Sequence, residues 1–144
     1  MPESASGSLS ALQMRMKLAA AWISVMFMYA YADLLGFYDR TLVESILDGS
    51  MPVFGPITPA LRLGIAVLMS VPAMMIFVSV VAQRNVARWA NIVAGVIFTL
   101  VIVATLIMGP PLYYRYFGIL ETALTVYIVW TAYRWVGQGQ SEGE

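Results

Sequence analysis

The chain has 144 residues, of which 60% are hydrophobic and 11% are charged, and its formal net charge is zero. A soluble domain carries about 25% charged residues, so this composition excludes an ordinary soluble protein and indicates an integral membrane protein. The chain lacks cysteine and histidine, which removes disulfides, thiol chemistry and the usual ligands of zinc and haem. We therefore expect no metal, no cofactor and no nucleic-acid partner.

The first apolar run follows a polar segment. Residues 1–12 are mostly small and polar, which predicts a flexible tail. The segment 14–38 is then long enough for a spanning helix, since about 20 apolar residues cross a bilayer. Its basic start and Ala30-Tyr31-Ala32 also fit a signal peptide with its cleavage site. Because the apolar run continues as far as Tyr38, we favour an uncleaved spanning helix.

A short amphipathic helix is predicted in the first outer loop. Thr41 and Glu44 have the spacing of a capping box, and Gly49 is a natural helix stop. The pattern between them predicts a surface helix over residues 41–48. Prolines at 52, 56 and 59 then favour an extended connection.

Three further spanning helices are predicted at approximately 60–82, 88–109 and 112–136. Pro72 lies inside the first of these and should kink it. Residues 137–144 form a polar tail. The expected fold is all-α: an integral membrane four-helix bundle over residues 13–136, with the short amphipathic helix on its surface.

Lysine and arginine positions predict the orientation in the cell membrane. Five of these residues lie on the side of the two termini and three on the opposite side, which favours both termini in the cytoplasm. The first group is Arg15, Lys17, Arg84, Arg88 and Arg134, and the second is Arg40, Arg62 and Arg115.

Glu121 is the residue that a membrane assignment does not explain. A rise of 1.5 Å per residue places it roughly 12 Å below the outer surface, where a charge is costly unless it is paired or functional. Asp33 and Arg62 have similar estimated depths, and helical periodicity places tyrosines near them. The predicted ligand-binding residues are Glu121, Asp33, Arg62, Tyr29, Tyr114 and Thr125.

Three functions are compatible with this polar pocket in the outer half of the bundle. The favoured one is a non-enzymatic membrane protein that binds a small ligand, ion or lipid. A transport role would require a homo-oligomer, because four helices make a thin pathway. One alternative is an accessory or scaffolding subunit, in which Arg62 pairs with one acid and a tyrosine satisfies the other. The second is a lipid-modifying enzyme that uses Glu121 as acid or base.

Three short motifs spread over most of the chain carry a family resemblance. They are Tyr29 to Asp33, Arg88 to Ile92 with Gly95, and Pro110-Pro111 through Glu121. With them the chain resembles a family of short, uncharacterised bacterial membrane proteins with four helices. Its general plan is also similar to that of the DoxX group. The resemblance implies a fold and assigns no catalytic residue.

Overall fold

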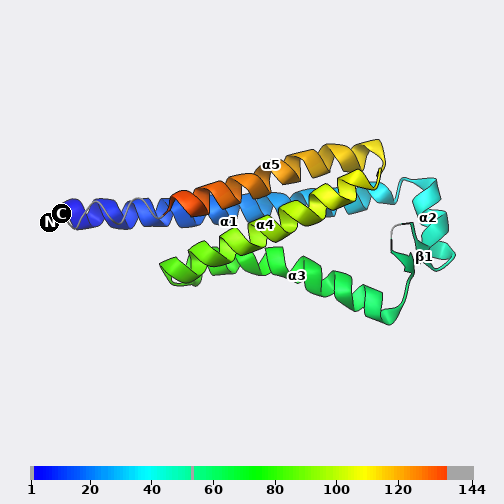
Figure 1. Cartoon of the computed structure of the whole chain (residues 1–144), viewed down its shortest axis with the longest axis horizontal. Helices are drawn as coiled ribbons and strands as arrows, with labels where there is room; N and C mark the ends of the chain where they lie inside the picture. The colour runs from blue at the N-terminus through cyan, green and yellow to red at the C-terminus, as the bar shows by residue number, and fades with distance from the viewer. Residues whose placement is uncertain (1, 53, 136–144) are drawn as a thin grey trace.

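The structure is a computed structural model that describes residues 2–52 and 54–135, with side chains from residue 7 onward. Four long helices run side by side, and a short helix and a small hairpin cap one end (Figure 1). The elements in chain order are α1 (Pro2–Gly36), α2 (Arg40–Leu47), β1 (Ser50–Met51), β2 (Gly55–Pro56), α3 (Pro59–Val81), α4 (Arg84–Ile107) and α5 (Leu112–Arg134). The all-α prediction is confirmed. The predicted tail at 137–144 lies outside the described residues.

The amino-terminal segment is helical, where the sequence predicts a flexible tail over residues 1–12. α1 begins at Pro2 and has 35 residues, so it is about 52 Å long, against about 35 Å for α3, α4 or α5. Proline is favoured at the first helical position, and no second proline interrupts the turns that follow. Figure 1 shows the first part of α1 projecting beyond the other helices.

The predicted surface helix is present as α2, but its amino-terminal cap differs from the prediction. Asp39, not Thr41, caps the helix, and its carboxylate accepts hydrogen bonds from the backbone N–H groups of Thr41 and Leu42. Glu44 instead forms an exposed ion pair of 2.7 Å with Arg40. The residues after α2 form a two-stranded antiparallel hairpin rather than a simple extended connection.

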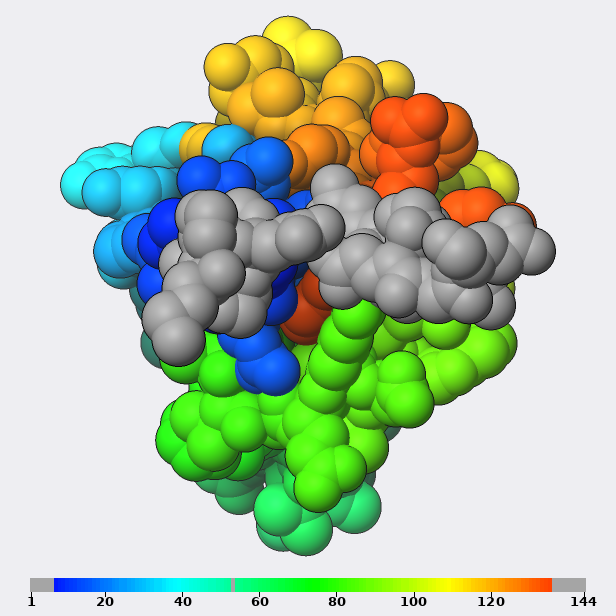
Figure 2. All heavy atoms as spheres, turned by 90° about the vertical axis from the view of Figure 1, so that its left-hand side faces the viewer, coloured from blue at the N-terminus to red at the C-terminus, as the bar shows by residue number. Residues whose placement is uncertain are grey.

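Within the described residues, three helices are long and apolar enough to cross a membrane: Gly7–Gly36 of α1, α3 and α4. Large apolar side chains also cover the outside of the molecule, such as Phe27, Val67 and Leu100, each more than half exposed. Soluble monomers rarely expose such continuous apolar surface. The chain is therefore a membrane protein by length, composition and surface. α5 has 23 residues and packs against both α1 and α4 (Figures 1 and 2).

A buried hydrogen-bond network joins α1, α3 and α4. The indole N–H of Trp22 donates to the Asn91 side-chain oxygen at 2.7 Å. The Asn91 amide in turn donates to the Ser79 hydroxyl at 3.0 Å and to the Ala87 carbonyl at 2.7 Å. The Ser79 hydroxyl donates to the Met75 carbonyl at 2.6 Å. Three fully buried side chains from three helices thus satisfy one another.

One end of the bundle carries Arg15, Lys17, Arg84, Arg88 and Arg134, and we call it the basic end. There Arg15 donates to the carbonyls of Val80 and Ala82, both at 2.7 Å, and so caps the last turn of α3. The buried ring of Trp135 lies below the guanidinium groups of Arg15 and Arg84, at 5.6 and 5.9 Å. Arg84 also donates to the Trp135 carbonyl at 2.6 Å. These contacts hold the ends of α3 and α5 against α1.

The opposite end is looser because α3 diverges from the other helices toward its amino terminus (Figure 1). The buried residues of α3 are Pro72, Met75 and Ser79, all in its second half. We call this the acidic end, since it carries Asp33, Asp39, Glu44 and Asp48.

Replacing Asn91 by Leu should lower the free energy of unfolding by about 1–3 kcal/mol, the cost of leaving a buried donor such as the Trp22 N–H without an acceptor. Thermal unfolding in detergent measures the change. Asn85→Leu is the matched control, because Asn85 is exposed in the first turn of the same helix. Equal unfolding midpoints for the two variants would contradict the role of the network.

Arg15→Ala should destabilise the protein by about 1.5–3 kcal/mol, since it removes charge-assisted hydrogen bonds to the end of α3. Lys17→Ala is the control, because Lys17 lies two residues away and is exposed. The measurement is again the unfolding midpoint in detergent. A loss for Lys17→Ala as large as that for Arg15→Ala would show that general charge at this end matters, not the cap.

Candidate functional site

Glu121 lies on the buried face of α5, and its side chain is only 4% exposed. Gly118 and Thr125 share this face, one turn before and one turn after. A Cβ atom at Gly118 would lie 2.8 Å from the Leu106 side chain, so the glycine lets α5 approach α4 closely. The helix periodicity therefore points the acid into the bundle, as the sequence predicts.

Glu121 has no ion pair and no hydrogen bond within the described part of the chain. Its polar surroundings are another carboxyl group and two phenols. Asp33 of α1 lies within electrostatic reach of Glu121. Tyr29 and Tyr114 are within reach of Glu121 and of each other. We call Asp33, Glu121, Tyr29 and Tyr114 the carboxyl–tyrosine cluster.

The cluster extends from the protein interior to its surface. Asp33 is exposed near the end of α1, Tyr29 and Tyr114 are half-buried, and Glu121 is buried. The two acids thus mark the outer and inner limits of one polar patch between α1 and α5. Such a patch offers oxygen atoms only, which suits a proton or a cation.

The predicted pairing of Arg62 with one of these acids is wrong. Among the described residues the one ion pair is that of Arg40 with Glu44, and Arg62 is exposed. The reason is the course of α3. Arg62 lies in the first turns of this helix. That half of α3 diverges from the other helices (Figure 1).

Thr125 has a structural partner. Its hydroxyl accepts a hydrogen bond from the Thr99 hydroxyl at 2.8 Å, which links α4 to α5 one turn below Glu121. A role for Thr125 in ligand binding stays a prediction, as it does for the other residues of the predicted set.

Tyr113 is a neighbour of the cluster that the sequence reasoning did not select. It lies within electrostatic reach of Asp33 and Asp39, and its hydroxyl lies close to Gly36 at the end of α1. The predicted topology could have indicated Tyr113, because it places the end of the first spanning helix and the start of the last on the same side of the membrane.

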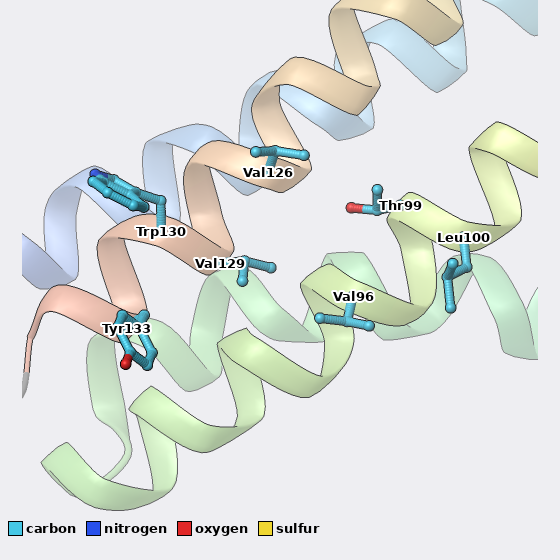
Figure 3. A pocket seen from close by; sticks show the side chains of 7 residues that line it. All are labelled: Val96, Thr99, Leu100, Val126, Val129, Trp130 and Tyr133. Carbon is cyan, nitrogen blue, oxygen red and sulfur yellow. The ribbon is translucent and has the colours of Figure 1, made fainter.

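Among the hollows on the surface of the described residues are two that include no member of the cluster. One of about 290 Å³ lies between α4 and α5 (Figure 3). Its lining residues are Val96, Thr99, Leu100, Val126, Val129, Trp130 and Tyr133. The other, of about 240 Å³, lies between α1 and α3 beside Met26 and Ile76. A lipid-modifying enzyme would need such a hollow at Glu121, so these two give that alternative no support.

Comparison with known proteins gives one family. The profile of a family of unknown function, DUF6326, matches residues 11–141. No curated protein and no solved structure matches the chain significantly. The resemblance to an uncharacterised family is confirmed, whereas nothing links the chain to the DoxX group. Because the match covers far more than half of its length, the chain belongs to the DUF6326 family.

Proposed function

We propose that this protein spans the cell membrane four times and binds a small cation, or a proton, in the carboxyl–tyrosine cluster. α5 is the fourth span in this proposal. It is as long as α3 and packs along both α1 and α4, which supports a crossing beside them. Arg115, Glu121 and Arg134 lower its average apolarity, but Arg115 and Arg134 lie in its first and last turns.

The observation that carries the proposal is the buried Glu121 without a cationic partner in the described part of the chain. A carboxyl group at bilayer depth is expensive as an isolated charge. It becomes stable with a bound proton or with a cation from outside. Arg62 would have supplied an internal cation, and its exposed position leaves that role to a ligand.

The rest of the cluster supports the same ligand class. Asp33 is exposed and lies within electrostatic reach of Glu121, so it can attract a cation toward the buried acid. The hydroxyl groups of Tyr29 and Tyr114 can donate to a carboxylate or coordinate a cation through oxygen. Transport would need a route from the cluster to the basic end, which a homo-oligomer would have to provide.

An accessory or scaffolding subunit is the second candidate. It is favoured by the outer half of α3, where Leu63 and Val67 are more than half exposed and no residue is buried. In that function the helix would dock on a partner in the membrane, and Glu121 would be a protonated structural residue.

Glu121→Gln separates the two functions. The amide has nearly the same shape and no ion pair is broken. The free energy of unfolding in detergent should therefore stay within about 0.5 kcal/mol of the parent protein or rise. Proton or monovalent-cation flux in liposomes, or cation-dependent stabilisation in detergent, should be lost. Glu44→Gln is the control, because it removes an exposed carboxylate and should leave cation binding unchanged.

Two outcomes would count against cation binding. A fall of about 3 kcal/mol in Glu121→Gln would show that the acid is half of a buried pair. Equal cation responses in the parent protein and the Gln variant would place the binding elsewhere.

Both termini should face the cytoplasm, because five of the eight Lys and Arg residues lie at the basic end. Single cysteines at Ser6 and Ser141 should resist an impermeant thiol reagent in intact cells. A cysteine at the exposed Asp48, near α2, should react. Since the natural chain has no cysteine, each label reports one site. The reverse labelling pattern would invert the topology.

A further inference from the structure

The described acidic side chains gather toward one end of the molecule, although Arg40, Arg62 and Arg115 lie on that side too. Every acidic side chain that the structure describes belongs to the acidic end or to its half of the bundle: Asp33, Asp39, Glu44, Asp48 and Glu121. The five cations of the basic end have no acidic partner among the described residues. Arg15 and Arg84 are satisfied by backbone carbonyls. Arg88 and Arg134 donate no hydrogen bond to a carbonyl or an acid among the described residues.

The hollow between α4 and α5 leads toward these two arginines. On α4, Trp89 shares a helical face with Val96 and Leu100, seven and eleven residues later. One face of α5 likewise carries three residues at helical spacing, Val126, Trp130 and Tyr133. The two helices run antiparallel, so both faces reach the basic end together (Figure 3). We call this surface the α4–α5 groove.

Tryptophan rings hold both arginines beside the groove. The guanidinium carbon of Arg88 lies 5.1 Å from the centre of the Trp89 ring, and that of Arg134 lies 4.8 Å from Trp130, which lines the groove. Stacking of this kind fixes a cation without neutralising it. The Nε atom of Arg88 is moreover buried without a hydrogen-bond acceptor. The Arg88 guanidinium group is therefore not fully satisfied within the described chain.

We propose that the α4–α5 groove binds an anionic phospholipid, with an acyl chain in the groove and the phosphate group at Arg88 and Arg134. The groove walls are almost entirely aliphatic and aromatic, which matches an acyl chain. Basic residues between membrane helices on the cytoplasmic side attract anionic headgroups. The Tyr133 hydroxyl offers a further donor at the same level. This site is separate from the carboxyl–tyrosine cluster and has no acidic lining residue.

The test uses the full chain in detergent with either dioleoylphosphatidylglycerol or dioleoylphosphatidylcholine added. The two lipids have the same acyl chains and differ in headgroup charge. Unfolding midpoints at increasing lipid concentration give an apparent affinity. Phosphatidylglycerol should stabilise the parent protein, and phosphatidylcholine should do so much less.

Four variants and one control locate the site. Arg88→Gln and Arg134→Gln should each weaken phosphatidylglycerol binding roughly fivefold, the change expected for one cation near an anionic headgroup. Arg88→Lys keeps the charge and should restore most of the binding. Val96→Trp fills the groove and should abolish the stabilisation. Lys17→Gln, which removes a cation of the same end away from the groove, should bind as the parent protein does.

Three results would overturn the proposal. Equal stabilisation by the two lipids would exclude headgroup recognition. Equal affinities in Arg134→Gln and Lys17→Gln would exclude a specific site, and Arg134 is exposed, so its variant should fold. If Val96→Trp converted a dimer to a monomer and left the lipid response unchanged, the groove would belong to a second copy of the chain.

Discussion

The Asn91 side chain is the contact on which the packing of α1, α3 and α4 depends. One amide group binds Trp22 and Ser79, so three helices share a single polar point in an apolar interior. Apolar packing alone tolerates small shifts of one helix along another, because one aliphatic contact can replace the next. Hydrogen bonds in a low-dielectric interior tolerate no such shift, since a displaced donor loses its partner. The edge-on contact of Trp22 with Phe98, at 6.0 Å between ring centres, follows from the same placement.

The charged side chains at the two ends of the bundle have different kinds of partner. At the basic end, backbone carbonyls of helix ends accept from Arg15 and Arg84, and the Trp135 ring packs against both guanidinium groups. At the acidic end α3 diverges from the other helices. Glu121 there lies within electrostatic reach of Asp33 and of the Tyr29 and Tyr114 hydroxyl groups. Under the proposed function, the ligand would bind at the acidic end, where Glu121 has no cationic partner among the described residues.

Much of this arrangement could be predicted from the sequence, where periodicity and composition decide the outcome. The long helices follow from the length of the apolar runs, α2 from its capping residues and the Gly49 stop, and the inward position of Glu121 from helix periodicity. The position of Arg62 could not be predicted, because it depends on the direction of α3 relative to its neighbours, a tertiary property. The cap of α2 was misassigned because Asp39 and Thr41 are both good caps two residues apart. The bond between Thr99 and Thr125 required knowing which faces of α4 and α5 meet.

The length of α1 has a mechanical consequence. A helix of about 52 Å exceeds the roughly 30 Å of bilayer hydrocarbon, and it continues without a break past the point where Arg15 anchors it to α3. The part beyond the anchor is a stiff rod fixed to the membrane-embedded body. Any tilt of α1 within the bilayer is therefore carried outward as a larger sideways displacement of its far tip. A fluorophore attached to that tip would therefore report small changes in the tilt of α1, including those that arise around Asp33 at the other end of the same helix.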